Sequence, residues 1–552
     1  MHPNAFPNFS VPFFASLTVA GGLAYIRVKL TSFPLYPLIF IGLILCGQIP
    51  LLLTGEIGAL QHFSIWAIIF LAALIVYLIA THHSESIIVP LLKIYALAAA
   101  CWVIVATPVW LGWTDGSALS LGPLALTTDL QMKINGPFAN GNVFGIMTAC
   151  AWCISWHEWI RHPSKTGRAM WWFAMLIFWI WSIGSMSLGV WLAESLAIIL
   201  MITHMWREPK KRLLIFIITA VVACTAANEL AGMHASEKLE ATQQIHSLIE
   251  SRTTPRLLLW ESVSHIILKR PVLGVGLGNL SAHYLDGQAT ALSLSNTDKE
   301  GLFTNFSAHN FLLHLWVEAG LSGLLLWLVI TIVLLLSLKQ HLQRGKVCSP
   351  SGIALMCALM LWLQGCFNIS LNLPYSFICF TLFLAWATSS LKPIQTRQIN
   401  ISPTLLISFL AVILVHSFWG MVQTTHSWIT FSQWVTKDLS IQANNDEAKA
   451  LIGDETVDPI LIELWARNVM LSKNTWNPAE TLPYIQYALN IVQRPILLRE
   501  AFAAHMALGQ FNEACRIGTL LKHQRWKKDE KNLAAYASAC ENRPYQGPIT
   551  LR

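Results

Sequence analysis

Long apolar runs dominate this sequence of 552 residues. A helix needs about 20 mostly apolar residues to cross the hydrocarbon core of a bilayer. Only 12% of the residues are charged, about half the share found in soluble domains. We therefore predict an all-α fold, a polytopic membrane helix bundle of about 12 transmembrane helices. The apolar runs lie at 11–28, 34–53, 65–80, 87–110, 142–160, 169–184, 187–205, 213–229, 310–338, 352–370, 373–391 and 402–424.

Lys and Arg gather in the loops that follow alternate runs. Short cytoplasmic loops of membrane proteins carry the excess of these residues. We therefore place the basic loops in the cytoplasm of a bacterial cell. The N-terminus, the loops 111–141 and 230–309, and the tail from 425 onward are then periplasmic. The basic loops contain Arg27 and Lys29; Arg161, Lys165 and Arg168; Arg207, Lys210, Lys211 and Arg212; Lys339, Arg344 and Lys346; and Lys392 and Arg397.

The chain divides into four parts on this topology. An N-terminal transmembrane bundle covers 1–229 and includes the periplasmic loop 111–141. A large periplasmic loop covers 230–309, further transmembrane helices cover 310–424, and a periplasmic helical domain covers 425–552. Within the large loop, an apolar stripe with helical spacing predicts an amphipathic helix that lies on the membrane surface or packs on the bundle. The stripe consists of Leu259, Val263, Ile266 and Ile267.

The tail reads as short helices with breaks at Arg494-Pro495 and at Gly509. Small residues at Ala504 and Ala514 flank the second break, which resembles one TPR-like (tetratricopeptide-type) helical hairpin. One such hairpin does not stack alone, so we expect the tail to dock on the loops or on a partner. Cys515 and Cys540 can form a disulfide if the tail lies in an oxidising compartment.

His309 is the first candidate for chemistry, at the point where the large loop enters the ninth run. An ordinary imidazole pKa near 6.5 suits a general base; the alternative is a hydrated histidine at a helix start. Glu318 is nine residues further on, roughly 13 Å along a helix and on its opposite side, so the two form no simple dyad. Glu318 can pair with His314. Such a carboxylate is either functional or a structural pair that sets helix register.

Arg252 and Arg256 are one helical turn apart. Their guanidinium groups can bind a lipid pyrophosphate, or they can simply contact headgroups and water. The Gly274–Asn279 segment, GVGLGN, has no βαβ context and is better explained as a tight turn than as a dinucleotide site. The sequence contains no P-loop and no acidic metal-binding pair. We expect no cofactor, no metal and no nucleic-acid partner.

Two segments together resemble the superfamily of O-antigen ligases and polymerases. They are RLLLWESVSHIILKRPVLGVGLGNL and SAHNFLLHLWVEAGLSG. The shared pattern is an Arg, a Trp four residues later, Pro before a glycine turn, then His-Asn, Glu and Gly-Leu-x-Gly. The matching residues here are Arg256, Trp260, Pro271, Gly274, Gly276, His309, Asn310, Glu318, Gly320, Leu321 and Gly323.

An upstream segment, GPFANGNVFGIM, is similar to a motif of bacterial protein O-oligosaccharyltransferases of the PglL type. That branch also has periplasmic helical tails. Two departures stand out. The branch motif carries Gln and Asn-His where this chain has Asn140 and Asn142-Val143, and the family's Ser-Arg pair is replaced by Ser187-Leu188. The missing Arg is replaced by Lys133, Arg252 or Arg270, or has no replacement.

The resemblance implies transfer of a preassembled glycan from undecaprenyl pyrophosphate to Ser or Thr of a periplasmic, pilin-like protein. It implies that His309 is the catalytic base. Arg256, with Arg252 or Lys133, would bind the pyrophosphate, and Glu318, Asn310, Asn140, Asn142 and Trp260 would support the site. The alternatives are ligation of O-antigen to lipid A core, O-antigen polymerisation, and, from other classes, a polysaccharide or lipid transporter or a TPR scaffold.

Overall fold

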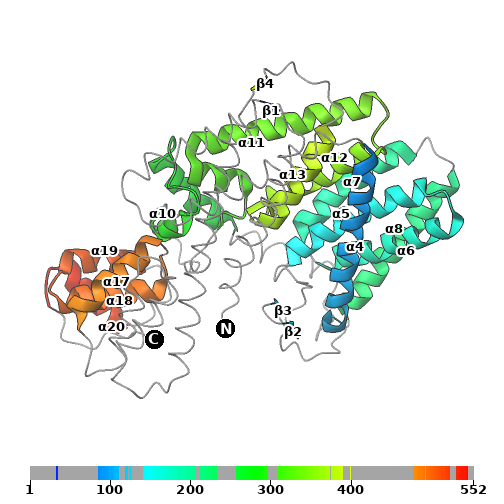
Figure 1. Cartoon of the computed structure of the whole chain (residues 1–552). Helices are drawn as coiled ribbons and strands as arrows, with labels where there is room; N and C mark the ends of the chain where they lie inside the picture. Colours follow the sequence, from blue (N-terminus) through cyan, green and yellow to red (C-terminus); the bar gives the residue numbers. More distant parts are fainter. Residues whose placement is uncertain are drawn as a thin grey trace.

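A computed structural model describes fourteen segments of the chain, and in them the protein is all-α apart from four strands of two or three residues (Figure 1). The strands are β1 (Phe33–Pro34), β2 (Leu119–Leu121), β3 (Leu124–Leu126) and β4 (Gln398–Ile399). The described residues are 33–34, 85–110, 119–121, 124–126, 141–185, 187–205, 210–232, 256–295, 307–372, 374–388, 398–399, 477–491, 493–521 and 530–544.

Helices occupy most of each predicted apolar run that the structure describes. They are α4 (Glu85–Trp110), α5 (Gly141–Arg161), α6 (Lys165–Gly184), α7 (Leu188–Met205), α8 (Lys210–Gly232), α11 (Phe311–Gln343), α12 (Pro350–Gly365) and α13 (Pro374–Thr388). The runs 11–28, 34–53, 65–80 and 402–424 lie outside the described residues, apart from Pro34. Among the described helices, α11 alone is long and apolar enough to cross a membrane. The count of twelve therefore stays a prediction.

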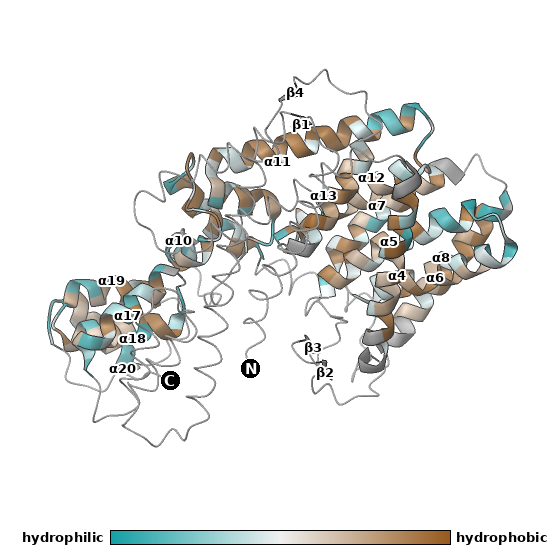
Figure 2. Cartoon of the chain, in the orientation of Figure 1, coloured by the Kyte–Doolittle hydropathy of each residue, from teal (hydrophilic) through white to brown (hydrophobic). Residues whose placement is uncertain are grey.

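The bundle has an inner core and apolar outer faces. Helix α5 is buried from Val143 to Ile160, and α4, α6, α7 and α12 pack around it. Outward-facing apolar side chains on α4, α8 and α11 remain exposed, and Figure 2 shows these helices as largely hydrophobic. A water-soluble surface rarely carries so continuous an apolar face, whereas a bilayer accommodates it. Exposed examples are Ile94, Leu97, Ile104, Leu214, Ile218, Val221, Leu325, Leu328, Ile332 and Leu335.

Contacts between α5 and α12 show which loops share an end of the bundle. Gln364 Nε2 donates to the carbonyl of Asn142 over 3.4 Å, and Cys150 Sγ lies 3.9 Å from the carbonyl of Cys357. The two helices are therefore antiparallel. The basic loops after α5 and after α11 lie together at one end, and the start of α11 lies at the other. This agrees with the alternation of basic loops in the sequence.

A short antiparallel pairing of β1 with β4 joins two further loops. Phe33 pairs with Ile399, and Pro34 pairs with Gln398. The sequence places both loops on the same side of the membrane, after the first and the eleventh runs. The pairing requires such a shared side, so it is consistent with that part of the predicted topology.

In the described part of the tail, four helices each pack on the next: α17 (Pro478–Ile491), α18 (Pro495–Ala507), α19 (Phe511–Leu521) and α20 (Glu530–Cys540). The predicted breaks are confirmed, because α18 begins at Pro495 and Gly509 turns the chain with φ +70°. Ala504 and Ala514 are fully buried on either side of that turn. The assignment to the tetratricopeptide class stays a prediction.

The tail docks on the large loop, one of the two arrangements that the sequence left open. Helix α10 (Leu280–Ser295) contacts α17 and α19 (Figure 1). Gln493 fixes the contact, since its N–H donates to the carbonyl of Ser281 over 3.0 Å. The Gln493 side chain accepts from the N–H of Leu285 at 3.0 Å and donates to Asp286 at 3.2 Å. The tail therefore shares one hydrophobic core with the large loop.

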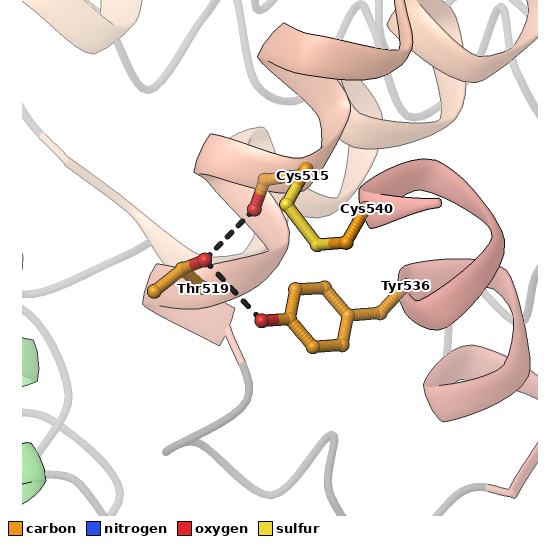
Figure 3. Close-up of a disulfide and its surroundings, with 4 residues drawn as sticks. All are labelled: Cys515, Thr519, Tyr536 and Cys540. Atoms are coloured by element: carbon orange, nitrogen blue, oxygen red, sulfur yellow. Dashed lines mark hydrogen bonds between the residues drawn. A yellow bond between two sulfur atoms is a disulfide. The ribbon is translucent and has the colours of Figure 1, made fainter. Parts of the chain in front are cut away.

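A disulfide joins Cys515 on α19 to Cys540 on α20 (Figure 3). Beside it, Thr519 Oγ1 donates to the carbonyl of Cys515 over 2.9 Å and lies 3.4 Å from the hydroxyl of Tyr536. The link ties α20, the last described helix, to the helix that docks on α10. Disulfides persist in oxidising compartments.

Loss of this disulfide should destabilise the tail. Cys515→Ser together with Cys540→Ser should lower the free energy of unfolding of the tail by about 2–4 kcal/mol, because the unfolded chain loses a constraint. Protease sensitivity of the tail in the purified full-length protein, against temperature, measures the change. Cys224→Ser, which removes an exposed free thiol, should leave the tail unchanged. Equal stability of the double variant and the wild type would contradict the expectation.

Candidate active site

His309 has an unusual backbone conformation. Its φ is +48°, in the left-handed region that non-glycine residues rarely adopt. Such strain costs about 1–3 kcal/mol and persists where neighbours over-determine it, often at functional sites. Ser307 Oγ accepts the His309 N–H over 3.1 Å. Asn310 caps α11, because its side chain accepts the N–H of Leu313 at 3.1 Å. Asn310 therefore supports the position of His309 through the backbone.

Trp260 ties the His309 loop to the helix that carries Arg256. That helix covers 256–269, and the predicted stripe of Leu259, Val263, Ile266 and Ile267 is buried. The stripe therefore packs into the core that the large loop shares with the tail, instead of facing a membrane surface. The Trp260 indole N–H donates to the carbonyl of Ala308, next to His309, over 3.0 Å. Trp260 follows Arg256 by one helical turn, so this bond brings the His309 loop beside the Arg256 end of the helix.

The surroundings keep His309 neutral. Burial is the main cause that lowers the pKa of His309 to about 4, the nearby Arg256 cation lowers it further, and a hydrogen bond with Asn368 acts in the opposite sense. A neutral imidazole has a free lone pair at neutral pH and can accept a proton. Burial also lowers the pKa of Arg256, but a guanidinium stays charged in proteins. The site therefore holds a base and a fixed cation close together.

Glu318 connects α11 to the glycine turn. Its carboxylate accepts the N–H of Gly278 at 2.8 Å and the N–H of Leu280, the first residue of α10, at 3.4 Å. A carboxylate at a helix N-terminus satisfies free N–H groups and the helix dipole. The predicted pair is also present, since His314 Nε2 lies 3.4 Å from Glu318 Oε2 and both side chains are buried. Glu318 therefore has a structural role in the site.

The GVGLGN segment is a tight turn between the 256–269 helix and α10, as predicted. Gly274, Gly276 and Gly278 all have positive φ, and so does Gly320, which kinks α11. The turn lies against the kink: the N–H of Gly276 donates to the carbonyl of Glu318 at 2.9 Å. A Cβ on Gly274 would lie 2.4 Å from that carbonyl oxygen. Only glycine permits this approach of two backbones.

A polar turn after α12 completes the surroundings of His309, and sequence reasoning missed it. The run 352–370 was expected to be helical throughout, but α12 ends at Gly365. The residues beyond it turn inward. Asn368 is buried and acts on the pKa of His309, Asn372 Nδ2 donates to Ser307 Oγ at 2.5 Å, and Ser370 donates to Gln364. Three polar residues at the end of an apolar run were the available signal.

The upstream motif reaches this turn through Asn142. The Asn142 carbonyl accepts from Gln364, and Gln364 accepts from Ser370. Asn140, Lys133 and Arg252 lie outside the described residues, so their roles stay predictions. Arg270 is fourteen positions after Arg256, just beyond the other end of that helix and roughly 21 Å away along its axis. It is therefore a poor replacement for a second Arg beside His309.

One protein-family model matches the chain. The O-antigen ligase model covers residues 173–328, which include Arg256, the glycine turn, His309 and Glu318. The match supports the O-antigen ligase superfamily. The match also supports an enzyme that performs glycosyl transfer of the ligase or polymerase type. It supports a membrane location as well. No curated protein sequence matches the chain.

The glycine turn provides a test with a matched control. Gly274→Ala should lower both thermal stability and activity, because the new Cβ clashes with the backbone of α11. Gly345→Ala introduces the same change at φ +63°, with nothing within 4 Å of the new Cβ. It should cost about 1 kcal/mol or less. Thermal unfolding in detergent measures both variants. A similar loss for the two variants would contradict the proposed packing.

The charge of Arg256 should be visible in the titration of His309. Arg256→Gln removes a neighbouring cation, so the pKa of His309 should rise from about 4 toward its ordinary value. Carbethoxylation by diethyl pyrocarbonate, which requires the neutral imidazole, gives the midpoint when peptide mass spectrometry follows His309 against pH. Arg270→Gln should leave the midpoint in place. An unchanged or lower midpoint in Arg256→Gln would show that the cation does not lower the pKa of His309.

Proposed function

We propose that this protein is an oligosaccharyltransferase that moves a preassembled glycan from undecaprenyl pyrophosphate to a Ser or Thr hydroxyl of a periplasmic, pilin-like protein. The observation that carries the proposal is the neutral His309 held beside the Arg256 cation. A lipid pyrophosphate is already a good leaving group, so this step needs no nucleotide. The family match supports glycosyl transfer in general, and the protein acceptor rests on the upstream motif and the helical tail.

Arg256 would bind the pyrophosphate of the donor. A guanidinium makes two-point hydrogen bonds with phosphate oxygens. As the bond between sugar and phosphate breaks, negative charge accumulates on the leaving oxygen, and a fixed cation in a poorly hydrated place stabilises it. Arg256 is partly buried, and burial lowers its pKa, so the guanidinium is less hydrated than on an open surface. Arg252 or Lys133 would supply a second positive charge.

His309 would act on the acceptor. The acceptor oxygen attacks the anomeric carbon, its proton passes to the free ring nitrogen of His309, and the carbon–oxygen bond to the pyrophosphate breaks. The products are the glycosylated protein and undecaprenyl pyrophosphate, and the proton returns from His309 to solvent. One displacement inverts the anomeric carbon. The mechanism needs no covalent glycosyl intermediate and no pair of catalytic carboxylates.

The proposed location is the inner membrane, with the site and the tail in the periplasm. The basic loops after α5 and after α11 lie at the end of the bundle opposite His309, and the positive-inside rule favours a periplasmic site for such an arrangement. The Cys515–Cys540 disulfide supports the same side for the tail. The tail docks on α10 of the large loop, so an acceptor bound there would be held on the same side of the membrane as His309. Membrane lipid surrounds the bundle.

Co-expression with a lipid-linked glycan pathway tests the proposal. Wild-type protein should add one glycan mass to a pilin, and His309→Ala should reduce transfer at least about 100-fold because it removes the base. The protein should remain in the membrane at the wild-type level. His265→Ala, on the 256–269 helix, is the matched control and should transfer normally. Intact mass of the pilin is the readout.

The same experiment separates the acceptors. A lipopolysaccharide core acceptor in place of the pilin tests ligation, and lengthened lipid-linked glycan tests polymerisation. If the core is modified or the lipid-linked chains lengthen while the pilin stays unmodified, the pilin is not the acceptor. The proposed transfer chemistry would still hold. Full transfer by His309→Ala would end the proposal. Deletion of the tail distinguishes a scaffold, which loses all function, from an enzyme, which keeps slow transfer.

A further inference from the structure

The apolar outer face of α11 is a stripe with two defined ends. Beyond the kink at Gly320, α11 is helical to Gln343, and its exposed apolar side chains all lie within about 120° around the axis (Figure 2). From Leu321 to Leu342 the stripe covers twenty-one positions, which is about 31 Å at 1.5 Å per residue. The hydrocarbon core of a bilayer has the same thickness, about 30 Å. The stripe consists of Leu321, Leu325, Leu328, Ile332, Leu335, Leu336 and Leu342.

The segment 268–273 of the large loop lies at the outer end of this stripe. The kink of α11 interrupts its helical hydrogen bonds, and the backbone of the large loop replaces them. The N–H of Leu321 donates to the carbonyl of Val272 at 2.9 Å, and the N–H of Val275 donates to the carbonyl of Val317 at 2.8 Å. In an unbroken helix, the N–H of Leu321 would donate to the Val317 carbonyl. The exchange of partners fixes the segment at the level of Leu321.

The segment combines exposed apolar side chains with exposed cations. Leu268, Val272 and Leu273 are 74%, 62% and 41% exposed, and Lys269 and Arg270 are exposed between them. The apolar side chains continue the stripe of α11 instead of forming an isolated patch. Long basic side chains at such a boundary bury their aliphatic stems in apolar surroundings and keep their charges at the level of the headgroups. The composition therefore matches the edge of a bilayer.

Trp316 provides an aromatic side chain at the same boundary. It precedes Leu321 on α11 and is partly exposed, and its indole N–H donates to the carbonyl of Pro271 over 3.2 Å. Trp is enriched at the interface between membrane and water. The ring therefore lies just outside the level at which the apolar stripe begins, and it binds the segment 268–273 directly.

We propose that the segment 268–273 anchors the large loop in the outer leaflet of the membrane. Its apolar side chains enter the edge of the hydrocarbon, and Lys269 and Arg270 contact the phosphates of anionic phospholipid headgroups. The positive-inside rule does not oppose these two cations, because it counts loops of up to about 60 residues and the loop 230–309 is longer. The anchor fixes the large loop, and with it the docked tail, at one height above the bilayer. This role goes beyond the proposed glycosyl transfer and does not depend on it.

The charges around Lys269 favour an anionic surface. Lys269 lines a crevice between α10 and α19 together with Asp286 and Arg516. Asp286 already accepts from the side chain of Gln493, and Arg516 pairs with Glu513 at 2.8 Å. With the exposed Arg270 included, three cations stand against two carboxylates. Such a net positive patch is attracted to anionic lipid.

Photo-cross-linking of the full-length protein tests the anchor. Benzoylphenylalanine replaces the exposed Val272, and the protein is placed in nanodiscs of phosphatidylcholine and phosphatidylglycerol in equal parts. Mass spectrometry should find phospholipid on the peptide that contains position 272, as it should for the same label at Leu328 in the stripe. The label at Asn542, in the exposed end of the tail, should give no such adduct. Equal yields at 272 and 542, no lipid adduct at 272, or a cross-link to a second copy of the chain would overturn the anchor.

The lipid class of the adducts tests the two cations. The share of phosphatidylglycerol at position 272 should exceed that at Leu328 by about threefold or more. Lys269→Gln together with Arg270→Gln should lower it to the share at Leu328. Lys339→Gln, which removes an exposed cation at the other end of the stripe, is the matched control and should leave it unchanged. An unchanged share in the double variant would show that the cations do not bind headgroups. Cross-linking needs no turnover, so a protein that transfers no glycan would refute the proposed function and still give a clear result here.

Discussion

The Glu318 carboxylate accepts two backbone N–H groups of the glycine turn and contacts His314, all in the interior of the protein. A buried carboxylate is costly without such partners, so these contacts hold the segments together. They join the kink of α11 to the turn and to the start of α10. Because α10 also contacts the tail through Gln493, the same connection runs from the apolar helix α11 to the tail. The positions of Arg256 and His309 at either side of this connection depend on it.

In the proposed reaction the site separates the two tasks that glycosyl transfer from a lipid pyrophosphate requires. Arg256 would provide charge, and His309 would provide a neutral base. Their proximity favours the neutral imidazole, because the Arg256 cation lowers the pKa of His309 and so preserves the lone pair of the ring. Burial strengthens both effects, since water would otherwise screen the cation and stabilise the imidazolium. The left-handed backbone conformation of His309 is strained, and this conformation sets the position of the imidazole ring.

Local patterns predicted much of the fold and part of the site. The buried stripe of the 256–269 helix, the breaks in the tail and the His314–Glu318 pair depend on residues within a few positions of one another, and periodicity or turn chemistry reveals them. The bond from Trp260 to Ala308 and that from Gln493 to α10 join residues far apart in sequence, so no local pattern predicts them. The turn that contains Asn368 was missed because it lies within the apolar run 352–370, which reads as an uninterrupted span.

Binding of undecaprenyl pyrophosphate to the purified protein tests the central claim most directly, namely that Arg256 holds the donor and His309 acts on the acceptor. The dissociation constant should rise about tenfold or more in Arg256→Gln, since a charge-assisted bond to phosphate contributes about 1.5–3 kcal/mol. It should stay at the wild-type value in His309→Ala. Equal affinity of wild type and Arg256→Gln, or equal weakening in both variants, would contradict this division of roles.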